Sequence, residues 1–338
     1  MSKILTISIA AYNIQDYLVE TLESLIRCET ANEMDVIVIN DGSRDDTSRI
    51  AHEYAEKAPS IIRVVDKENS GYGSTINTSI QLARGKYYRL LDGDDWVDPV
   101  ELDKLIHFLE HSSVDLVITK YRMMYNSKSS LESLNWPYDS VMLPIDDRLD
   151  YSFSMHMLTF RTDAVRQCLI DHPITEYANY TDTEFILKCV SAVKTVALFD
   201  AEVYQYRMGR EGQSVSLQSW FRNISTACNV SLVLANYYET GILPSSTMSP
   251  QIKEWALEQC VGSAANKCRL YMRMGLGRKE YEGMLCFLSE LKQASSIVYN
   301  DTLVCFPAAR RGKASYFAFL MNALPLRCKT IVRNIVKQ

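Results

Sequence analysis

The sequence predicts an α/β fold with a mostly parallel sheet flanked by helices, followed by a helical C-terminal region. Short β-branched apolar runs alternate with helical patterns through the first 120 residues, which is typical of parallel strand–helix–strand units. From about residue 217 onward, strand signals stop and long helical patterns continue. Because 338 residues suffice for about two domains, we expect one domain over 1–215 and a helical region with a basic tail over 216–338.

The predicted elements follow one another in a regular order. Apolar runs predict strands over 4–10, 35–40, 60–66, 86–91 and 115–119. Apolar residues at helical spacing predict helices over 16–27, up to about 57, over 74–84 and over 99–111. After a weaker stretch at 120–150, we expect helices near 162–170 and 182–192, strands near 194–199 and 202–207, and long helices over 217–240, 250–274 and 278–294. This alternation implies right-handed crossovers between parallel strands.

The composition is that of an ordinary globular protein, with 47% hydrophobic and 23% charged residues and a net charge of −5. That acidity argues against a nucleic-acid partner, because proteins that bind nucleic acid usually carry a basic excess. The charge is unevenly spread. Residues 302–338 hold seven basic residues and no acidic ones, which leaves residues 1–301 with a net charge of −12.

Cysteine usage and hydropathy bear on the compartment. The nine cysteines include no C-x-x-C pair and lie mostly in apolar stretches, so we expect reduced thiols and neither a disulfide framework nor a zinc site. The first residues lack a signal-peptide pattern, and no run of 18 apolar residues occurs. These features predict a cytoplasmic protein.

Polar clusters follow three of the predicted strands. Tyr12 comes just after the first strand, Asp41 ends the second, and the D-G-D-D sequence of 92–95 ends the fourth. In open parallel sheets, ligands bind at the carboxyl ends of the strands. We therefore expect these distant segments to converge on one crevice.

The D-G-D-D sequence is typical of a cation site. Two carboxylates one residue apart, Asp92 and Asp94, can share a divalent metal, or one can hold the metal and the other a ribose hydroxyl. A bare D-x-D also occurs by chance in solvated turns, so its position after an apolar strand is what favours the metal site. Asp98 instead predicts a helix N-cap, with Pro99 as the first helical residue and Glu101 two residues later.

Three other residues each have a functional and a structural interpretation. Asp41 can accept a hydrogen bond from a base or ribose, or can merely form the turn after its strand. Tyr12 can stack on a base through its flat face, or can belong to the core. Gly71, in the S-G-Y-G sequence of 70–73, permits close backbone approach to a ligand at a helix N-terminus, or provides loop flexibility alone.

Four segments carry these residues in a characteristic order: ISIAAYNIQDYLVETLESL, VIVINDGSRDDT, ENSGYGSTINTSIQLARGKYYRLLDGDDWVDP and YTDTEFIL. Together they resemble the family 2 glycosyltransferases, which have the Rossmann-like GT-A fold, over about residues 3–215. The resemblance implies an inverting transfer from a nucleoside-diphosphate sugar. It also implies UDP as the nucleotide and Mg²⁺ or Mn²⁺ as the cofactor.

The resemblance implies a role for each matching residue in the donor site. Tyr12 would lie near the base, and Asp41 would accept a hydrogen bond from the imide N–H of the base. Gly71 and Gly93 would lie against the nucleotide sugar. Asp92 would contact the ribose or the sugar.

The resemblance also implies which carboxylates take part in the chemistry. Asp94 would hold the metal on the diphosphate, and Asp182 matches the family's general base, which takes the proton of the acceptor hydroxyl. Two positions depart from the family pattern: Ala11 stands in a turn that usually contains proline, and Thr181 precedes Asp182 where glutamate is common. Asp182 also has a structural interpretation, because Thr181 and Glu184 fit a capping box. A helix start can nevertheless carry a base.

Two further candidates lie near the acceptor and the diphosphate. His156 can face the acceptor, although a structural histidine is the alternative. Arg210, in a polar loop with Arg207, Gln213 and Ser214, can close over the diphosphate and exclude water. The alternative for this loop is an exposed connection to the helical region.

The basic tail has two interpretations of its own. The apolar and aromatic residues 315–326, followed by alternating basic and apolar residues, fit a peripheral membrane-surface helix attracted by anionic lipid. They equally fit a terminal helix that buries its apolar side on the body. A lipid-linked acceptor would explain the first interpretation.

The sequence supports a metal-dependent inverting glycosyltransferase that acts on a glycan or glycolipid of the cell surface. The alternative is a catalytically silent nucleotide-sugar-binding subunit that supports a partner enzyme, and the retained Asp92, Asp94 and Asp182 favour the first. A sugar nucleotidyltransferase would need a glycine-rich, basic N-terminal loop, and residues 10–13 do not provide one.

Overall fold

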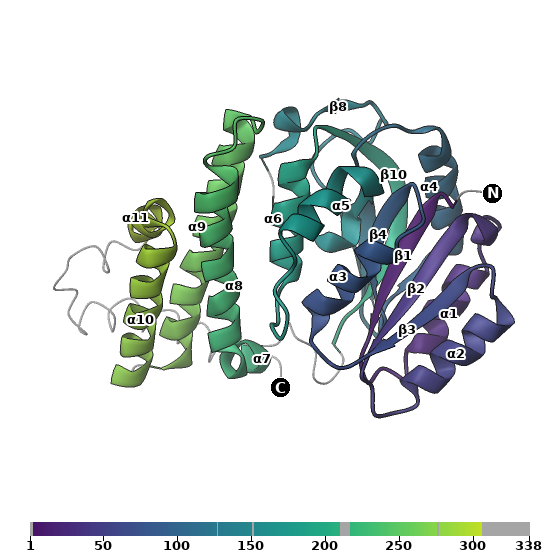
Figure 1. Ribbon diagram of the computed structural model, residues 1–338, viewed down its shortest axis with the longest axis horizontal. Helices are drawn as coiled ribbons and strands as arrows, with labels where there is room; N and C mark the ends of the chain where they lie inside the picture. The colour runs from purple at the N-terminus through teal and green to yellow at the C-terminus, as the bar shows by residue number, and fades with distance from the viewer. Residues whose placement is uncertain (1–2, 127, 151, 210–216, 276, 306–338) are drawn as a thin grey trace. The chain divides into compact units, whose positions relative to one another are not determined.

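The computed structural model describes residues 3–126, 128–150, 152–209, 217–275 and 277–305 (Figure 1). The chain forms two compact units: Met1–Tyr177 with Thr181–Glu211, and Ala178–Tyr180 with Gly212–Gln338. The boundary expected after residue 215 falls in a segment outside the described residues. The two units are described separately.

The first unit is built on one mixed sheet. Its strand order is β3-β2-β1-β4-β9-β6-β10-β5, with β7 on β6 and β8 on β10. The strands are β1 (Leu5–Ala11), β2 (Met34–Asp41), β3 (Ile62–Lys67), β4 (Tyr87–Asp92), β5 (Trp96–Val97), β6 (Leu116–Met124), β7 (Ser129–Glu132), β8 (Leu143–Pro144), β9 (Leu158–Arg161) and β10 (Thr195–Arg207). β1, β2, β3 and β4 pair in parallel, as do β6 and β10.

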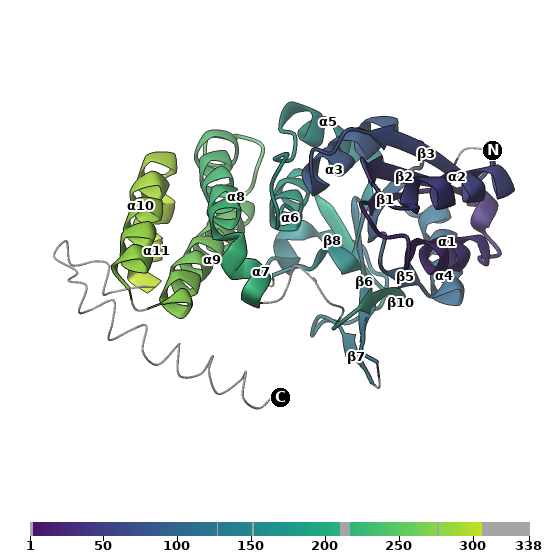
Figure 2. The ribbon, with the colours of Figure 1, turned by 90° about the horizontal axis from the view of Figure 1, so that it is seen from below.

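Helices cover both faces of this sheet. They are α1 (Leu18–Ile26), α2 (Thr47–Lys57), α3 (Tyr72–Leu82), α4 (Pro99–His111), α5 (Thr162–Asp171) and α6 (Asp182–Ala192). Apolar side chains of α1, α2 and α4 form one core layer with the inner strands, and α3, α5 and α6 lie on the other side of the sheet (Figure 2). Because both faces are covered, β2 is buried along its whole length, which is why its sequence shows a continuous apolar run.

The expected strands and helices of the first 120 residues are all present. The sequence did not indicate β9, which runs antiparallel between β4 and β6, nor the short strands β5, β7 and β8. The two strands expected near 194–199 and 202–207 are one strand, β10, whose pairing with β6 is interrupted by register shifts. Strands of two to four residues are too short to show a period, and their partners are distant in sequence.

Local signals at the start of α4 are confirmed. Oδ1 of Asp98 accepts hydrogen bonds from the main-chain N–H groups of Val100 and Glu101, at 3.0 and 3.1 Å. Pro99 occupies the first helical position, where its missing N–H costs nothing. Asp98 therefore caps a helix, as the sequence predicts, and stands apart from the neighbouring acidic turn.

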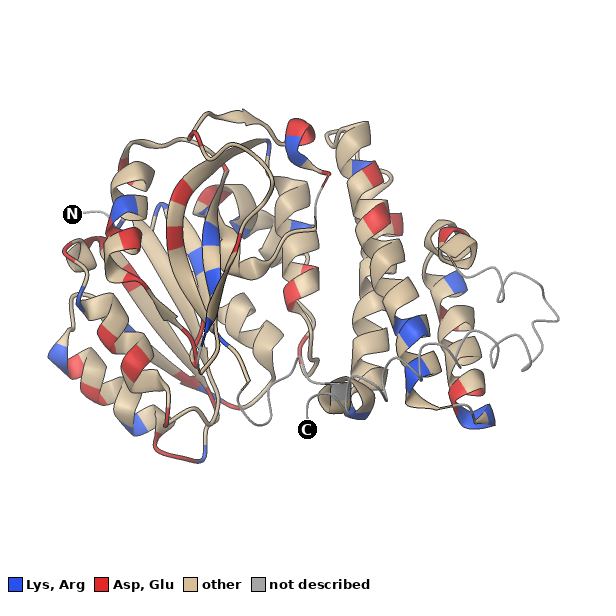
Figure 3. Cartoon of the chain, turned by 180° about the vertical axis from the view of Figure 1, so that it is seen from behind, with Lys and Arg blue, Asp and Glu red and all other residues tan. Residues whose placement is uncertain are grey.

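Charged side chains also join β6 to β10 across the sheet. Lys120 contacts Asp200 at 2.5 Å, and Nε of Arg122 donates to Glu202 at 3.1 Å. The acidic and basic positions of the chain are marked in Figure 3. These cross-strand pairs help to hold β10 in register, which matters because the end of β10 reaches the site described below.

The second unit is helical, as expected. It contains α7 (Leu217–Arg222), α8 (Ile224–Tyr237), a π-helical turn (Tyr238–Ile242), α9 (Pro250–Met274), α10 (Arg278–Ala294) and α11 (Ser296–Cys305). Trp255, Cys260, Phe287 and Leu291 lie in its buried interior. No helix of the described ranges is both long enough and apolar enough to cross a bilayer.

A buried carboxylate on β2 makes the stability of the first unit depend on pH. Asp35 is 2% exposed and accepts hydrogen bonds from Arg63, from the N–H of Arg84 and from the hydroxyl of Thr6. Burial alone would raise the pKa of Asp35, but these donors outweigh it and lower the pKa.

We expect Asp35→Asn to lower the free energy of unfolding by about 1–3 kcal/mol at pH 7, because it weakens charge-assisted bonds. The contribution of a carboxylate with a lowered pKa is complete above its unfolded pKa of about 3.9 and is lost as pH falls toward the folded value. The difference in the free energy of unfolding between wild type and Asp35→Asn should therefore become smaller as the pH falls from 5 to 3. Urea denaturation across this range measures it, and a constant gap would contradict the assignment.

Candidate active site

The site lies at the carboxyl edge of β1, β2 and β4. These strands are neighbours, with Ala11 opposite Asn40 and Ala10 opposite Asp92. Their ends therefore bring together Tyr12, Asp41 and the acidic turn 92–95, which confirms that the polar clusters meet at one edge.

The acidic turn is held tightly against its surroundings. The hydroxyl of Thr21 on α1 donates to the carbonyls of Gly93 and Asp95, at 2.9 and 2.6 Å. A Cβ on Gly93 would lie 2.2 Å from the side chain of Ile14 and 2.8 Å from the carbonyl oxygen of Ala10. Glycine is therefore required at this position for packing alone, apart from any ligand.

Asp95 is the buried member of the turn, with 1% of its surface exposed. One carboxylate oxygen accepts from the hydroxyl of Tyr204 at 2.6 Å, and the other accepts from the N–H of Arg207 at 2.7 Å. Burial, reinforced by the charges of Asp92 and Asp94, raises the pKa of Asp95. Asp95 thus ties the turn to the end of β10, a link that the sequence did not reveal.

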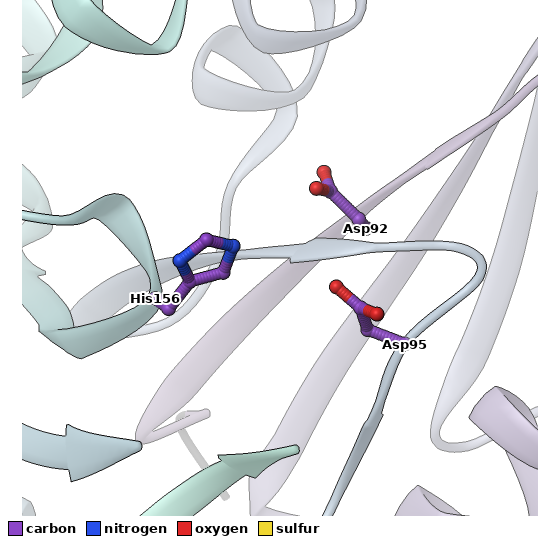
Figure 4. Close-up of side chains that lie close together, drawn as sticks. All are labelled: Asp92, Asp95 and His156. Carbon is purple, nitrogen blue, oxygen red and sulfur yellow. The ribbon is translucent and has the colours of Figure 1, made fainter. Parts of the chain in front are cut away.

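Asp92, Asp95 and His156 form a candidate metal site. One ligand atom from each lies within 4.8 Å of the others, and the side chains converge on one another in Figure 4. Carboxylate oxygens and imidazole nitrogen are suitable ligands for Mn²⁺, and the oxygens also suit Mg²⁺. A cation would also stabilise the charged form of Asp95, whose pKa is raised by burial and by its acidic neighbours, so the donor set fits a divalent metal.

The surroundings of His156 keep its ring neutral. Burial and, to a lesser extent, the Arg89 guanidinium lower the pKa of His156 to about 3. Its Nδ1 lies 2.6 Å from the hydroxyl of Ser154, and the ring stacks on Tyr206 at 4.3 Å between centroids. A neutral imidazole can ligate a metal, whereas its protonated form cannot. The structure therefore places His156 beside the acidic turn, a position that the sequence did not indicate.

Asp94 differs from Asp95 in exposure. Its side chain is partly exposed, and its carbonyl accepts a hydrogen bond from Nε of Arg207 at 2.8 Å. It does not belong to the three-residue cluster found among the described residues. Asp94 as the metal ligand stays a prediction.

Asp41 is buried and already has several partners. Nζ of Lys67 lies 2.7 Å from Oδ1, and the N–H groups of Ser70 and Gly71 donate to the two oxygens at 3.0 and 2.8 Å. Gly71 has a φ of +86°, a conformation that favours glycine. The observed role of Asp41 is thus to hold the glycine loop 70–73, and contact with a base stays a prediction.

Tyr12 lies exposed at the end of β1, with 48% of its surface accessible. The next residue, Asn13, has a φ of +51°, and its side chain accepts a hydrogen bond from the N–H of Arg44 at 2.8 Å. This turn fixes the end of β1 beside the segment that follows β2. An exposed ring at this edge is available for stacking on a base.

Tyr72 is a second residue that the sequence did not single out. Its hydroxyl donates to Oδ1 of Asp92 at 2.8 Å. Burial, the Asp92 carboxylate and the more distant Asp182 carboxylate all raise the pKa of Tyr72. The glycine loop is thereby connected to the acidic turn, and the charge of Asp182 acts on the same tyrosine.

Asp182 is the first residue of α6, but the expected capping box does not form. Thr181 makes no side-chain capping bond, and its hydroxyl is buried with no hydrogen-bond partner in the described part of the chain. Glu184 turns instead to the N–H of Thr175, at 3.1 Å, and to Nζ of Lys188, at 2.6 Å. A capping box therefore does not explain why Thr181 and Glu184 stand at these two positions.

Arg207 closes the other side of the acidic turn. It contacts Glu20 at 2.5 Å and lies over the rings of Trp96 and Tyr17, at 4.5 and 5.1 Å from their centroids. Arg210, with Gln213 and Ser214, lies outside the described residues. Of the residues named for the predicted polar loop, Arg207 is described, and closure of the loop over a diphosphate stays a prediction.

Comparisons with known proteins bear on the family and the fold of this chain. Residues 6–169 match the model of the glycosyl transferase family 2. The chain carries a family 2 glycosyl transferase domain. It is 35% identical over 117 residues to the uncharacterized glycosyltransferase EpsJ of Bacillus subtilis, an alignment that covers 35% of this chain and 33% of the relative. The chain thus spans about a third of the length of that curated relative.

Two solved structures show the fold of this glycosyl transferase domain. TarS 1–349 of S. aureus, in complex with UDP-GlcNAc, has a TM-score of 0.55 at 17% identity and covers 91% of this chain and 92% of that one. The mannosyltransferase PcManGT of Pyrobaculum calidifontis, in complex with GDP-Man and Mn²⁺, has a TM-score of 0.52 at 14% identity and covers 97% and 88%. The predicted GT-A fold with a helical C-terminal region is confirmed.

The hydroxyl of Tyr204 provides a test of the acidic turn. Besides donating to Asp95, it accepts from the N–H of Asp92 at 3.2 Å. We expect Tyr204→Phe to lower the free energy of unfolding by about 1–3 kcal/mol, because the buried carboxylate of Asp95 and the partly buried N–H of Asp92 each lose a partner.

The matched control is Tyr206→Phe, whose hydroxyl makes no hydrogen bond within the described residues and should cost less than about 0.5 kcal/mol. Urea denaturation of both variants measures the difference. Equal losses would show that Tyr204 contributes through its ring alone.

Proposed function

We propose that this protein is a metal-dependent inverting glycosyltransferase that moves a sugar from a nucleoside-diphosphate sugar to an acceptor hydroxyl. The observation that carries the proposal is the convergence of Asp92, Asp95 and His156 at the carboxyl edge of the sheet. The charge of Asp182 reaches the same place, since it raises the pKa of Tyr206 together with the three carboxylates of the acidic turn. In this proposal a cation site and a nearby base would supply the two parts that such a transfer needs.

The donor would bind along the strand edge. Tyr12 would stack on the base, Gly71 and Asp41 would lie beside it, and Asp92 would contact the ribose or the sugar. A divalent metal at the acidic turn would act as a Lewis acid on the diphosphate leaving group. The donor base is the least defined part, because TarS was solved with UDP-GlcNAc and PcManGT with GDP-Man. We propose UDP and test GDP beside it.

The chemistry on the acceptor side would belong to Asp182. In a single displacement the acceptor hydroxyl attacks the anomeric carbon and loses its proton as the bond forms, while the bond to the diphosphate breaks. An ionised carboxylate at the start of a helix is well placed to take that proton, since the helix N-terminus favours its negative charge. The acceptor itself would be a glycan or a lipid-linked glycan.

A peripheral position at the inner face of the cell membrane is part of the same proposal. It would use the basic tail 302–338, which lies outside the described residues after 305. Seven basic residues without an acidic one would be attracted to anionic lipid. Such a position would suit a lipid-linked acceptor.

The base assignment is tested by Asp182→Asn. We expect the turnover rate to fall about 10²- to 10⁴-fold, because the amide cannot accept the proton, while the affinity for the nucleoside diphosphate with Mn²⁺ changes less than about threefold. Release of nucleoside diphosphate from UDP-GlcNAc, UDP-glucose and GDP-mannose measures turnover, and water can take the place of the acceptor hydroxyl.

The control for that variant is Asp163→Asn, which makes the same chemical change in the first turn of α5, where Asp163 is exposed. It should leave both quantities unchanged. Undiminished turnover in Asp182→Asn would remove the base assignment. Nucleotide binding without turnover in the wild type would support the silent subunit instead.

The proposed metal site is tested by replacing His156, the one uncharged member of the cluster. We expect His156→Phe to weaken Mn²⁺ binding in the presence of UDP by at least about tenfold, because it removes a ligand while preserving an aromatic ring. His111→Phe, on the exposed end of α4, is the matched control and should have no effect. Isothermal titration of Mn²⁺ measures both.

Asp94→Asn completes the comparison. If Asp94 also holds the metal, as the sequence predicts, this variant should weaken Mn²⁺ binding to a similar extent. A loss in Asp94→Asn with unchanged binding in His156→Phe would contradict the site built from Asp92, Asp95 and His156.

A further inference from the structure

One segment of the first unit contacts both the glycine loop and the helix that carries Asp182. Residues 173–177, which we call the strap, are part of the connection between α5 and α6. Most of the strap is exposed, yet Ile174 is 1% exposed, and several of its main-chain groups bind buried side chains. Such a network is unusual for a surface connection.

On one side, the strap is fixed to α3 and the glycine loop. The side-chain amide of Asn77 donates to the carbonyl of Ile174 and accepts from its N–H, both at 2.8 Å. A Cβ on Gly73 would lie 2.1 Å from the carbonyl oxygen of Thr175, so only glycine permits this approach. The N–H of Tyr177 donates to the carbonyl of Ser70 at 2.6 Å.

On the other side, the strap is fixed to α6 by a buried ion pair. Glu184 is 0% exposed and accepts from the N–H of Thr175, and Lys188 donates to the carbonyl of Pro173 at 2.9 Å. The two side chains pair with each other at 2.6 Å. A buried pair of this kind adds little net stability, but it fixes geometry when each charge also binds the backbone.

The glycine loop is in turn bound to the donor-site carboxylates. The N–H groups of Ser70 and Gly71 bind Asp41, and the hydroxyl of Tyr72 binds Asp92. A continuous series of hydrogen bonds therefore runs from the donor site, through the glycine loop and the strap, to the first turn of α6.

We infer that the strap positions Asp182 relative to the donor site, with Asn77 and the Glu184–Lys188 pair as the positioning residues. This inference rests on the proposed function, in which Asp182 is the base. Donor binding to the glycine loop then also orders the start of α6. A displacement of about 1 Å at a reacting group can cost about 10²-fold in rate, so a fixed connection of this kind affects turnover more than donor affinity.

The inference is tested by hydrogen–deuterium exchange of the full chain with Mn²⁺ and either UDP or GDP. In the wild type, the nucleotide should slow exchange both in residues 68–77 and in residues 173–186. Asn77→Asp replaces the amide that donates to the carbonyl of Ile174 with a carboxylate, which cannot donate. In this variant the nucleotide should still slow exchange in residues 68–77 but no longer in residues 173–186. Asn32→Asp makes the same chemical change at an exposed site near the start of β2 and should behave as wild type.

Turnover provides the second readout. We expect Asn77→Asp to lower the turnover rate per folded molecule at least about tenfold and to change the KM for the donor less than about threefold. A general loss of folding lowers the total rate only in proportion to the folded fraction, so each rate is divided by the folded fraction obtained from urea denaturation. The double variant Glu184→Gln/Lys188→Met replaces the buried charges with side chains of similar volume, a change that is often neutral for stability. It loses the bond to Pro173 and should lower turnover in the same way, so the test survives if Asn77→Asp fails to fold.

The outcomes separate this inference from the proposed function. If neither nucleotide slows exchange in 68–77, or if Asp182→Asn retains full turnover, the proposed function fails and the inference fails with it. If the nucleotide protects 68–77 and Asp182→Asn is inactive, but Asn77→Asp keeps its protection of 173–186 or its turnover rate, the inference alone is overturned.

Discussion

The structure of the site depends on the crowding of carboxylates at the end of β4. Three acids lie within four residues, and Asp95 is almost fully buried, so its charge is poorly screened by water from the charges of Asp92 and Asp94. The fold offsets this with donors fixed from other elements: the hydroxyl of Tyr204, the hydroxyl of Tyr72 and the N–H of Arg207. The remaining imbalance of negative charge is what makes the turn suited to a cation.

That constraint explains features of the fold that lie far from the turn. β10 must run to Arg207, because its last residues bring Tyr204 and the N–H of Arg207 to Asp95. The antiparallel strand β9, inserted between β4 and β6, follows directly on the 3₁₀ turn that carries His156. This antiparallel insertion is what brings the neutral His156 ring to the acidic turn, where it completes the candidate metal site.

The sequence predicted the features that are local or that repeat with a period. Strands buried on both faces appear as apolar runs, Asp98 caps its helix through adjacent residues, and the acidic turn follows its strand directly. The sequence could not show Tyr204, which lies more than 100 residues from its partner Asp95, nor β9, which is too short to have a period. The sequence also could not decide between two roles that fit the same residue. The spacing of Glu184 suits a capping box, but in the structure Glu184 pairs with the buried Lys188 one turn further along the helix.

The glycine loop shows how this limit affects the chemistry. By spacing alone, Gly71 and the start of α3 suit an anion, because N–H groups at a helix N-terminus attract negative charge. In the structure, the N–H groups of Ser70 and Gly71 are already bound to Asp41, and Gly73 is needed for the approach of Thr175. A diphosphate at this loop would meet the charge of Asp41 with two of its expected donors occupied. Negative charge on the donor is therefore better compensated by a cation at the acidic turn, which leaves the glycine loop to connect the donor site with the helix of the proposed base.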